Sequence, residues 1–132
     1  MSKIGDVIQS ADWKKEKHAP VIECPDTVKA GEYFDVTLSV GKEIPHPNTT
    51  EHFIAWISLF FYPEGGKFAH QIGRYEFSAH GEAAGGPNTG PAYTNPKVVA
   101  SVKVTTPGTL YAVSFCNIHG LWESSKEIAV SE

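Results

Sequence analysis

Residues 33–40 read YFDVTLSV, with apolar side chains at every second position from Phe34 to Val40. This two-residue period is typical of a β-strand that turns one face to a core and the other to water. Residues 97–105, KVVASVKVT, repeat the alternation, whereas residues 53–62, FIAWISLFFY, are apolar on both faces. We therefore expect a central strand at 53–62, covered on both sides, and half-buried strands at 33–40 and 97–105.

Further extended segments are expected at 68–79, 109–115 and 127–130, with turns at the Pro and Gly residues of 63–66 and 107–108. Apart from a short turn around 10–17, no long window has the 3.6-residue period of a helix. The pattern predicts an all-β fold, an immunoglobulin-like antiparallel β-sandwich or barrel of about seven strands.

The composition fits one domain, residues 1–132, with 41% hydrophobic residues available for a single core. The net charge of −4, spread along the chain, argues against nucleic-acid binding. No apolar run approaches the roughly 18 residues of a membrane span, and the polar start lacks the apolar core of a secretory signal. We therefore expect a soluble, cytoplasmic protein with no membrane partner. The two cysteines, Cys24 and Cys116, exclude a disulfide scaffold and a four-cysteine metal centre.

Three segments depart from the strand pattern and contain four of the six histidines: 16–20 (EKHAP), 43–52 (EIPHPNTTEH) and 116–120 (CNIHG). A β-sandwich holds its connecting loops rigidly at the ends of its sheets, so loops distant in sequence can meet at one site. A fourth irregular segment, 85–96, is rich in Gly and Pro and has no ligand residue. We expect it to be a surface loop that could contact another subunit.

The histidine-bearing loops predict a metal site. Cys116 and His119 have a spacing at which a tight loop brings a thiolate and an imidazole to one ion. His46 lies between two prolines, which hold the backbone extended and fix the direction of its side chain. Four imidazoles and one thiolate exceed the four ligands of a structural zinc site and suit iron with an open sixth position. The candidate donors are His18, His46, His52, Cys116 and His119, with the carboxylate of Glu16 close by in sequence.

The same segments, together with 41–45 (GKEIP) and 120–122 (GLW), resemble those of the superoxide reductases, the neelaredoxin and desulfoferrodoxin family. The likeness runs from about Asp12 to the C-terminus. It implies that the four loop histidines are equatorial iron ligands and that Cys116 is the axial ligand. It also implies that Glu16 closes the sixth position in the ferric state and that Lys17 attracts superoxide.

Because the chain has only two cysteines, it resembles the one-iron, neelaredoxin-like class and lacks a four-cysteine iron module. The resemblance implies one mononuclear iron ion per chain and the one-electron reduction of superoxide to hydrogen peroxide, without release of dioxygen. It further implies detoxification under oxidative stress, with electrons from rubredoxin or a similar carrier, and a homotetramer.

Two alternatives start from the same loops. A cupredoxin-like electron carrier also has a Cys and a His near its C-terminus, but it needs fewer histidines and usually a methionine, and Met1 is the only one here. A non-catalytic immunoglobulin-like module with an incidental metal is the other. We expect His70, His80 and Cys24 to lie outside the site, and Trp122 to shield one side of the iron.

Overall fold

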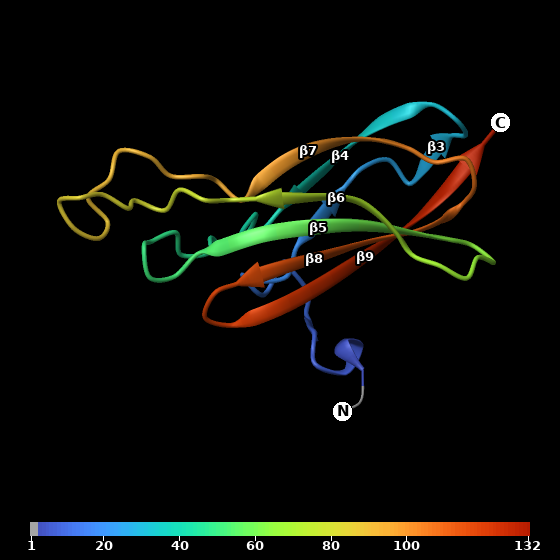
Figure 1. The fold of residues 1–132 in the computed structure, drawn as a ribbon. Coiled ribbons are helices and arrows are strands. Elements are labelled where there is room, and N and C mark those ends of the chain that lie inside the picture. Colours follow the sequence, from blue (N-terminus) through green and yellow to red (C-terminus); the bar gives the residue numbers. More distant parts are fainter. Residues whose placement is uncertain (1–2) are drawn as a thin grey trace.

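The computed structural model describes residues 3–132 as two β-sheets preceded by a short 3-10 helix, η1 (Ile4–Asp6) (Figure 1). The smaller sheet has the order β2-β4-β7, and the larger has the order β1-β9-β8-β5-β6 with β3 also paired to β9. The strands are β1 (Gln9–Ser10), β2 (Val21–Glu23), β3 (Thr27–Lys29), β4 (Tyr33–Ser39), β5 (Ile54–Pro63), β6 (His70–Glu76), β7 (Lys97–Lys103), β8 (Gly108–Cys116) and β9 (Gly120–Ser131).

The predicted all-β fold is confirmed, and the alternating segments form the strands that face the core. Val36 and Leu38 of β4 are fully buried, as are Ile57 and Leu59 of β5. These side chains meet between the two sheets, where removal of apolar surface from water stabilises the fold by about 25 cal/mol per Å². The hydrophobic core therefore lies between β4 and β7 on one side and β5 and β8 on the other.

Three details differ from the sequence-based expectation. β1 and β3 pair in parallel with β9 and are too short to leave a periodic pattern. β9 starts at Gly120 rather than 127, because its backbone pairs with β8 along a stretch whose side chains are mostly half-buried and show no two-residue alternation. β6 is shorter than the expected 68–79.

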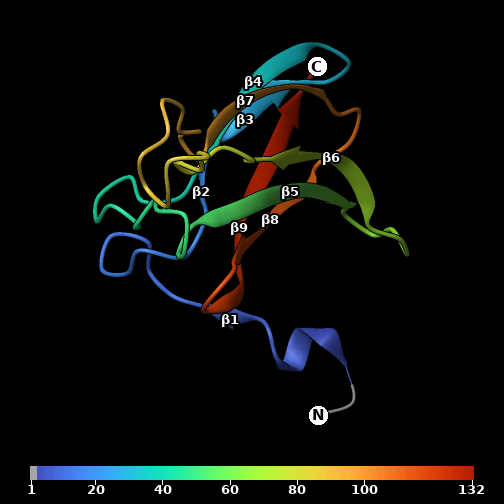
Figure 2. The same cartoon turned by 60° about the vertical axis from the view of Figure 1, so that its left-hand side comes forward.

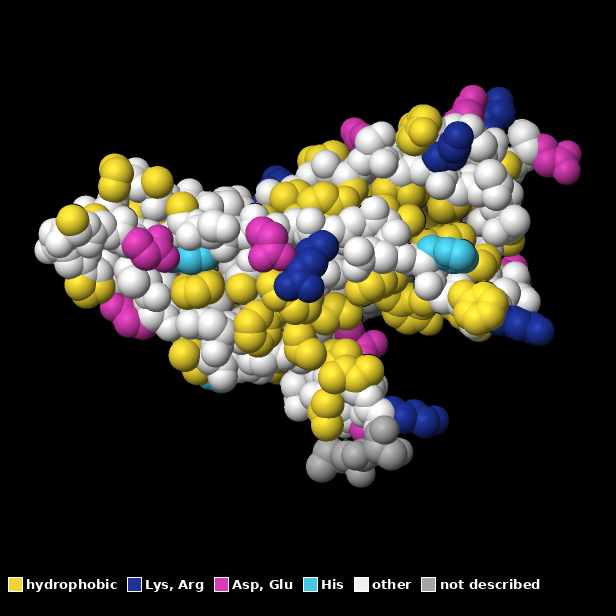
Figure 3. Space-filling model, viewed as in Figure 1, with side chains coloured by type: hydrophobic (Ala, Val, Ile, Leu, Met, Phe, Trp, Pro, Cys, Tyr) yellow, Lys and Arg dark blue, Asp and Glu magenta, His cyan; other side chains and the backbone are white. Residues whose placement is uncertain are grey.

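The expectation that β5 is covered on both sides is wrong for the face that points away from the core between the two sheets. Trp56 and Phe60 are only half-buried, and Tyr62 is 37% exposed. Neighbouring side chains partly cover this face: the Trp56 and Phe115 rings have centroids 5.6 Å apart, and the Arg74 guanidinium lies 4.1 Å from the Trp56 centroid. Figure 3 shows apolar side chains gathered over this sheet.

The loops that hold the predicted ligands lie at one end of the sandwich. Two views place segments 40–53 and 77–96 and the β8–β9 turn together at this end (Figures 1 and 2). Strand β8 runs from Gly108 at the opposite end to Cys116 at this one. Within residues 3–132, no helix is long and apolar enough to cross a membrane.

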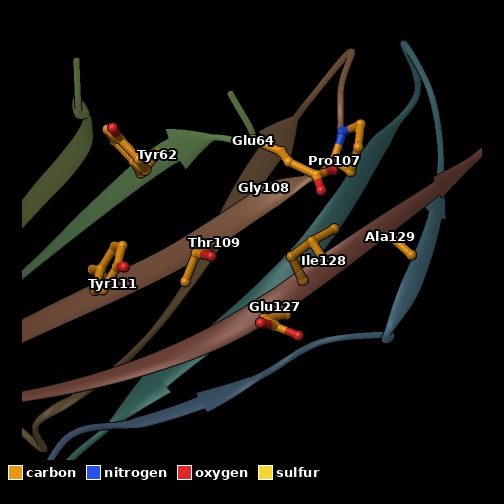
Figure 4. Close-up of a pocket in the computed structure, with 9 residues that line it drawn as sticks. All are labelled: Tyr62, Glu64, Pro107, Gly108, Thr109, Tyr111, Glu127, Ile128 and Ala129. Carbon is orange, nitrogen blue, oxygen red and sulfur yellow. The ribbon is translucent and has the colours of Figure 1, made fainter. Parts of the chain in front are cut away.

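The opposite end carries a groove of about 490 Å³ between the ends of β5, β8 and β9 (Figure 4). Its walls include Tyr62, Tyr111 and Ile128, with the carboxylates of Glu64 and Glu127 at its edge. None of the predicted ligands lines this groove, so the candidate site must be sought at the loop end.

Candidate metal centre

Four of the five predicted donors converge in the structure. The ligand atoms of His18, His52, Cys116 and His119 all lie within 4.8 Å of one another. They come from the loop before β2, the loop before β5, the end of β8 and the β8–β9 turn. Three segments distant in sequence therefore supply one cluster, as the loop argument predicted.

The β8–β9 turn places Cys116 and His119 side by side. Gly120 has a φ of 81°, a left-handed conformation that glycine adopts without strain, and it pairs with Cys116 across the hairpin. The Cys116 side chain is fully buried, and the backbone N–H of His119 donates to its Sγ at 3.3 Å. This hydrogen bond fixes the position of the sulfur next to the His119 backbone.

His52 approaches the same sulfur from the other loop. Its Nε2 lies 3.2 Å from Cys116 Sγ. The loop is closed by Thr49, whose backbone N–H donates to the His52 carbonyl at 3.0 Å and whose Oγ1 accepts from the His52 N–H at 3.0 Å. Asn117 joins the two loops, because its Oδ1 accepts from the Phe53 N–H at 2.9 Å and its Nδ2 donates to the Glu51 carbonyl at 2.8 Å.

His46 lies beside this cluster, with ring centroids 4.9 Å from His18 and 4.7 Å from His52. Its Nδ1 donates to the Pro47 carbonyl at 2.6 Å, which leaves the lone pair on Nε2. Within residues 3–132, this Nε2 is the one buried side-chain nitrogen or oxygen atom without a hydrogen-bond partner. Buried polar atoms are normally hydrogen-bonded, so a buried nitrogen lone pair without a donor indicates an atom available to bind a metal ion.

The electrostatics of His46 support the same interpretation. Burial lowers the pKa of His46 to about 4, and the nearby charges of His18, His52 and Lys17 act in the same direction. Burial and the charges of His119, His18 and Lys17 also lower the pKa of His52. Both imidazoles are therefore held in the neutral form that coordinates metals.

His18 is held from several sides. Its Nε2 lies 3.1 Å from His119 Nδ1, and its Nδ1 bonds to the Glu16 carboxylate at 2.5 Å. Its carbonyl accepts from the buried hydroxyl of Ser114 at 2.9 Å. Trp122 stacks on the ring, with centroids 5.0 Å apart and planes 15° apart, and donates from Nε1 to the His119 carbonyl at 3.1 Å.

The structure places Glu16 behind His18, at the ring nitrogen that faces away from His119. Besides Nδ1, its carboxylate accepts from the backbone N–H groups of His18 and Ala19. Burial alone would raise the pKa of Glu16, but these hydrogen bonds outweigh it and hold the pKa below its ordinary value. Lys17 is half-buried, and its charge reaches His46 and His52, as their lowered pKa values record.

These residues fit an iron ion. The set offers a buried thiolate and four imidazoles, including the unpartnered Nε2 of His46. A soft sulfur donor with several nitrogen donors suits iron, and the number of donors exceeds the four of a structural zinc site.

Sequence reasoning gave no role to several polar residues that hold the ligand loops, among them Asn48, His80, Asn88 and Asn117. Asn117 stands inside the CNIHG motif, so its position next to Cys116 was the available signal. His80 lies outside the cluster, as expected, and is buried with hydrogen bonds to Asn48 and Phe77. His70 is exposed, and Cys24 is half-buried with a free thiol.

Comparison with known proteins places the chain in a family. The desulfoferrodoxin family model matches residues 10–125. Neelaredoxin of Megalodesulfovibrio gigas is 61% identical over 97% of this chain and 98% of its own, and superoxide reductase of Pyrococcus furiosus is 55% identical over 92% and 95%. The chain superimposes on superoxide reductase (neelaredoxin) from Archaeoglobus fulgidus in the reduced form with a TM-score of 0.86, at 54% identity over 93% of this chain and 98% of that one. A crystal structure of a Thermotoga maritima relative matches with a TM-score of 0.97, at 55% identity over 100% of both chains. On sequence, fold and donor set, the chain belongs to the desulfoferrodoxin family.

Proposed function

We propose that this protein reduces superoxide to hydrogen peroxide at a single mononuclear iron ion. The expected enzyme class is confirmed by relatives named neelaredoxin and superoxide reductase at 61% and 55% identity over nearly the whole chain. The observation that best supports a metal site is the buried Nε2 of His46. It has no hydrogen-bond partner and lies beside the cluster of three imidazoles and Cys116.

We assign His18, His46, His52 and His119 as the nitrogen ligands that would hold the iron and Cys116 as its sulfur ligand. The donor set supports this assignment, since three imidazoles and one sulfur lie within reach of a single ion; His18 and Cys116 are buried, and His119 is exposed. The bound iron supplies the electron and the coordination position at which superoxide is reduced. The reaction consumes one superoxide, one electron and two protons and yields one hydrogen peroxide.

Lys17 attracts the substrate. The chain has a net charge of −4, so its overall field repels the superoxide anion, and a local cation is needed near the open side of the site. Lys17 precedes His18, and its charge is felt at His46 and His52. Water supplies the two protons, because the His119 side of the cluster is open to solvent.

Glu16 has two positions in this proposal. In the arrangement described above, it orients His18 through Nδ1 and keeps that ring nitrogen protonated. To close the sixth coordination position in the oxidised state, the carboxylate must exchange these hydrogen bonds for the metal. Its lowered pKa favours the ionised form that either position requires.

The electron donor is proposed to be a rubredoxin-like carrier, since these 132 residues contain two cysteines and no four-cysteine iron module. The single domain of residues 1–132 is proposed to assemble as a homotetramer. The half-exposed aromatic face of the larger sheet supports self-association, because such surface is costly in water. A cytoplasmic location stays a prediction from the sequence.

Two measurements on the purified protein test the proposed function. We expect about one iron per chain by metal analysis, and rapid consumption of superoxide by the reduced protein in stopped-flow or pulse-radiolysis experiments, with hydrogen peroxide as product. Copper in place of iron would instead favour the cupredoxin-like alternative, which the four imidazoles of the site disfavour. A colourless protein inert to superoxide would favour the non-catalytic module.

A further inference from the structure

Segment 77–96 packs against the loop that carries two of the proposed ligands. We call residues 46–52 the ligand loop, since it begins at His46 and ends at His52. The segment follows β6 and lies beside this loop at the same end of the sandwich (Figures 1 and 2). The sequence predicted a surface loop only for residues 85–96 of this segment.

His80 is the buried residue of this segment. The residue is 2% exposed, and its ring stacks on Phe53, with centroids 3.8 Å apart and planes 11° apart. Nε2 lies 2.6 Å from the Phe77 carbonyl oxygen, and Nδ1 lies 2.9 Å from Oδ1 of Asn48. The ring therefore contacts Asn48, within the ligand loop, and Phe53, the residue that follows His52.

The hydrogen bonds around His80 continue into the ligand loop. Asn48 Nδ2 donates to the Thr94 carbonyl at 3.1 Å, which leaves its Oδ1 directed at His80. Thr50 Oγ1 donates to the His80 carbonyl at 3.3 Å. Since Asn48 lies two residues after His46 and Thr50 two residues before His52, these bonds restrain the backbone next to both ligands.

Most of the segment is exposed, but hydrogen bonds within it give it a defined shape, so it can act as a support. The backbone N–H of Gly81 donates to Ala92 at 3.1 Å, and that of Gly90 to Gly81 at 2.9 Å. A Cβ at Gly90 would lie 2.3 Å from the Glu82 carbonyl oxygen, so only glycine fits there. His80 also pairs with Tyr93 in an isolated β-bridge.

We infer that His80 is a positioning residue of the metal centre, whose buried ring fixes the ligand loop between Asn48 and Phe53 and so sets His46 and His52 in place. This inference rests on the proposed function, because it takes both histidines as ligands. His80 itself does not contact the cluster, so its role is to hold other residues. Residues that orient metal ligands typically contribute about 10- to 100-fold to metal affinity.

The test compares His80→Phe and His80→Gln with Val102→Ala, which removes buried volume in β7 of the smaller sheet, away from every loop. The probes are ferrous iron and cobalt(II), with affinity measured by chelator competition, and the readouts include the visible thiolate band and the melting temperature of the metal-free protein. We expect His80→Phe to lower metal affinity by about 10- to 100-fold and to shift the band. His80→Gln should recover part of both, since an amide can restore one hydrogen bond. Val102→Ala should lower the melting temperature alone.

The inference is overturned if His80→Phe has the affinity and the band of the parent and resembles Val102→Ala in losing stability only. If His80→Phe does not fold, Asn48→Ala decides between the same two outcomes, because it removes the partner of His80 Nδ1. Failure of the proposed function is recognised separately: His46→Ala and His52→Ala would then bind metal as the parent does.

Discussion

His52 Nε2 lies 3.2 Å from Cys116 Sγ, although the two residues are 64 positions apart in the chain. The contact joins the loop before β5 to the end of β8, two strands that pair along their length. Because Ile54 pairs with Cys116 in that register, the residue two positions before Ile54 is carried to the sulfur. The thiolate and an imidazole are thus placed together by the strand pairing itself.

We predict that Cys116→Ser abolishes the visible thiolate-to-iron band of the oxidised protein, because a serine oxygen cannot replace the soft sulfur donor. Visible spectroscopy and metal analysis check this. Cys24→Ser is the matched control, since Cys24 is a free thiol outside the cluster, and it should keep both iron and colour. A band that survives in Cys116→Ser would remove Cys116 from the ligand set.

Glu16→Ala should still bind iron and reduce superoxide, because the proposed nitrogen and sulfur ligands remain. Its oxidised site should bind azide or cyanide more readily than the parent, as measured by spectral titration. Glu16→Gln keeps an oxygen acceptor for His18 Nδ1 but loses the charge. It therefore separates the role of Glu16 in orienting His18 from its role as a ligand of the oxidised iron. Unchanged anion affinity in both variants would limit Glu16 to orienting His18.

Lys17→Ala should lower the second-order rate constant with superoxide on the order of tenfold, with iron content unchanged. The reason is the loss of a cation that acts over a Debye length of about 8 Å at physiological salt. Stopped-flow rates at several ionic strengths check both the size and the screening. Lys14→Ala and Lys15→Ala, at exposed positions, serve as controls with smaller effects. A parent-like rate for Lys17→Ala at low salt would contradict the attraction.

Asn88→Ala should destabilise the metal-free protein by about 1–2 kcal/mol, measured by urea unfolding. Asn88 has a φ of 59°, which is strained for alanine, and its Oδ1 accepts from the Thr50 N–H at 2.7 Å. Asn88→Gly should cost less, because glycine adopts this backbone freely. Equal stability of the alanine variant and the parent would show that this contact with the ligand loop contributes nothing.

Removal of iron with a chelator should leave the β-sheet signal in far-UV circular dichroism intact and lower the melting temperature. The core residues between the sheets, such as Leu59 and Leu110, are buried without any contribution from a metal. Ferrous iron at about 100 times its dissociation constant should raise the free energy of unfolding by about 2.7 kcal/mol, because it binds the native state and not the unfolded chain. Loss of the strand signal on chelation would mean that the metal is required for folding.

The sequence by itself determined the fold class and the donor types. The alternation at 33–40 and 97–105 marks β4 and β7, because the two-residue period of a strand is a local property of the chain. The three loops could be recognised as irregular from the break in the strand pattern, and their histidines and Cys116 as candidate donors from residue type and spacing. The extent of β9 could not, because its pairing with β8 is made by backbone atoms that every residue has.

Only the tertiary structure decided how the loops hold one another. The position of Glu16 behind His18, the lone pair left on His46 Nε2, and the contact of Asn48 with His80 all depend on which side chains meet after folding. Asn48 and His80 are 32 residues apart, and no periodicity or spacing encodes such a pair. The sequence thus names the candidate donors, whereas contacts formed only on folding, such as those between segment 77–96 and the ligand loop, decide how the loops that carry them are held.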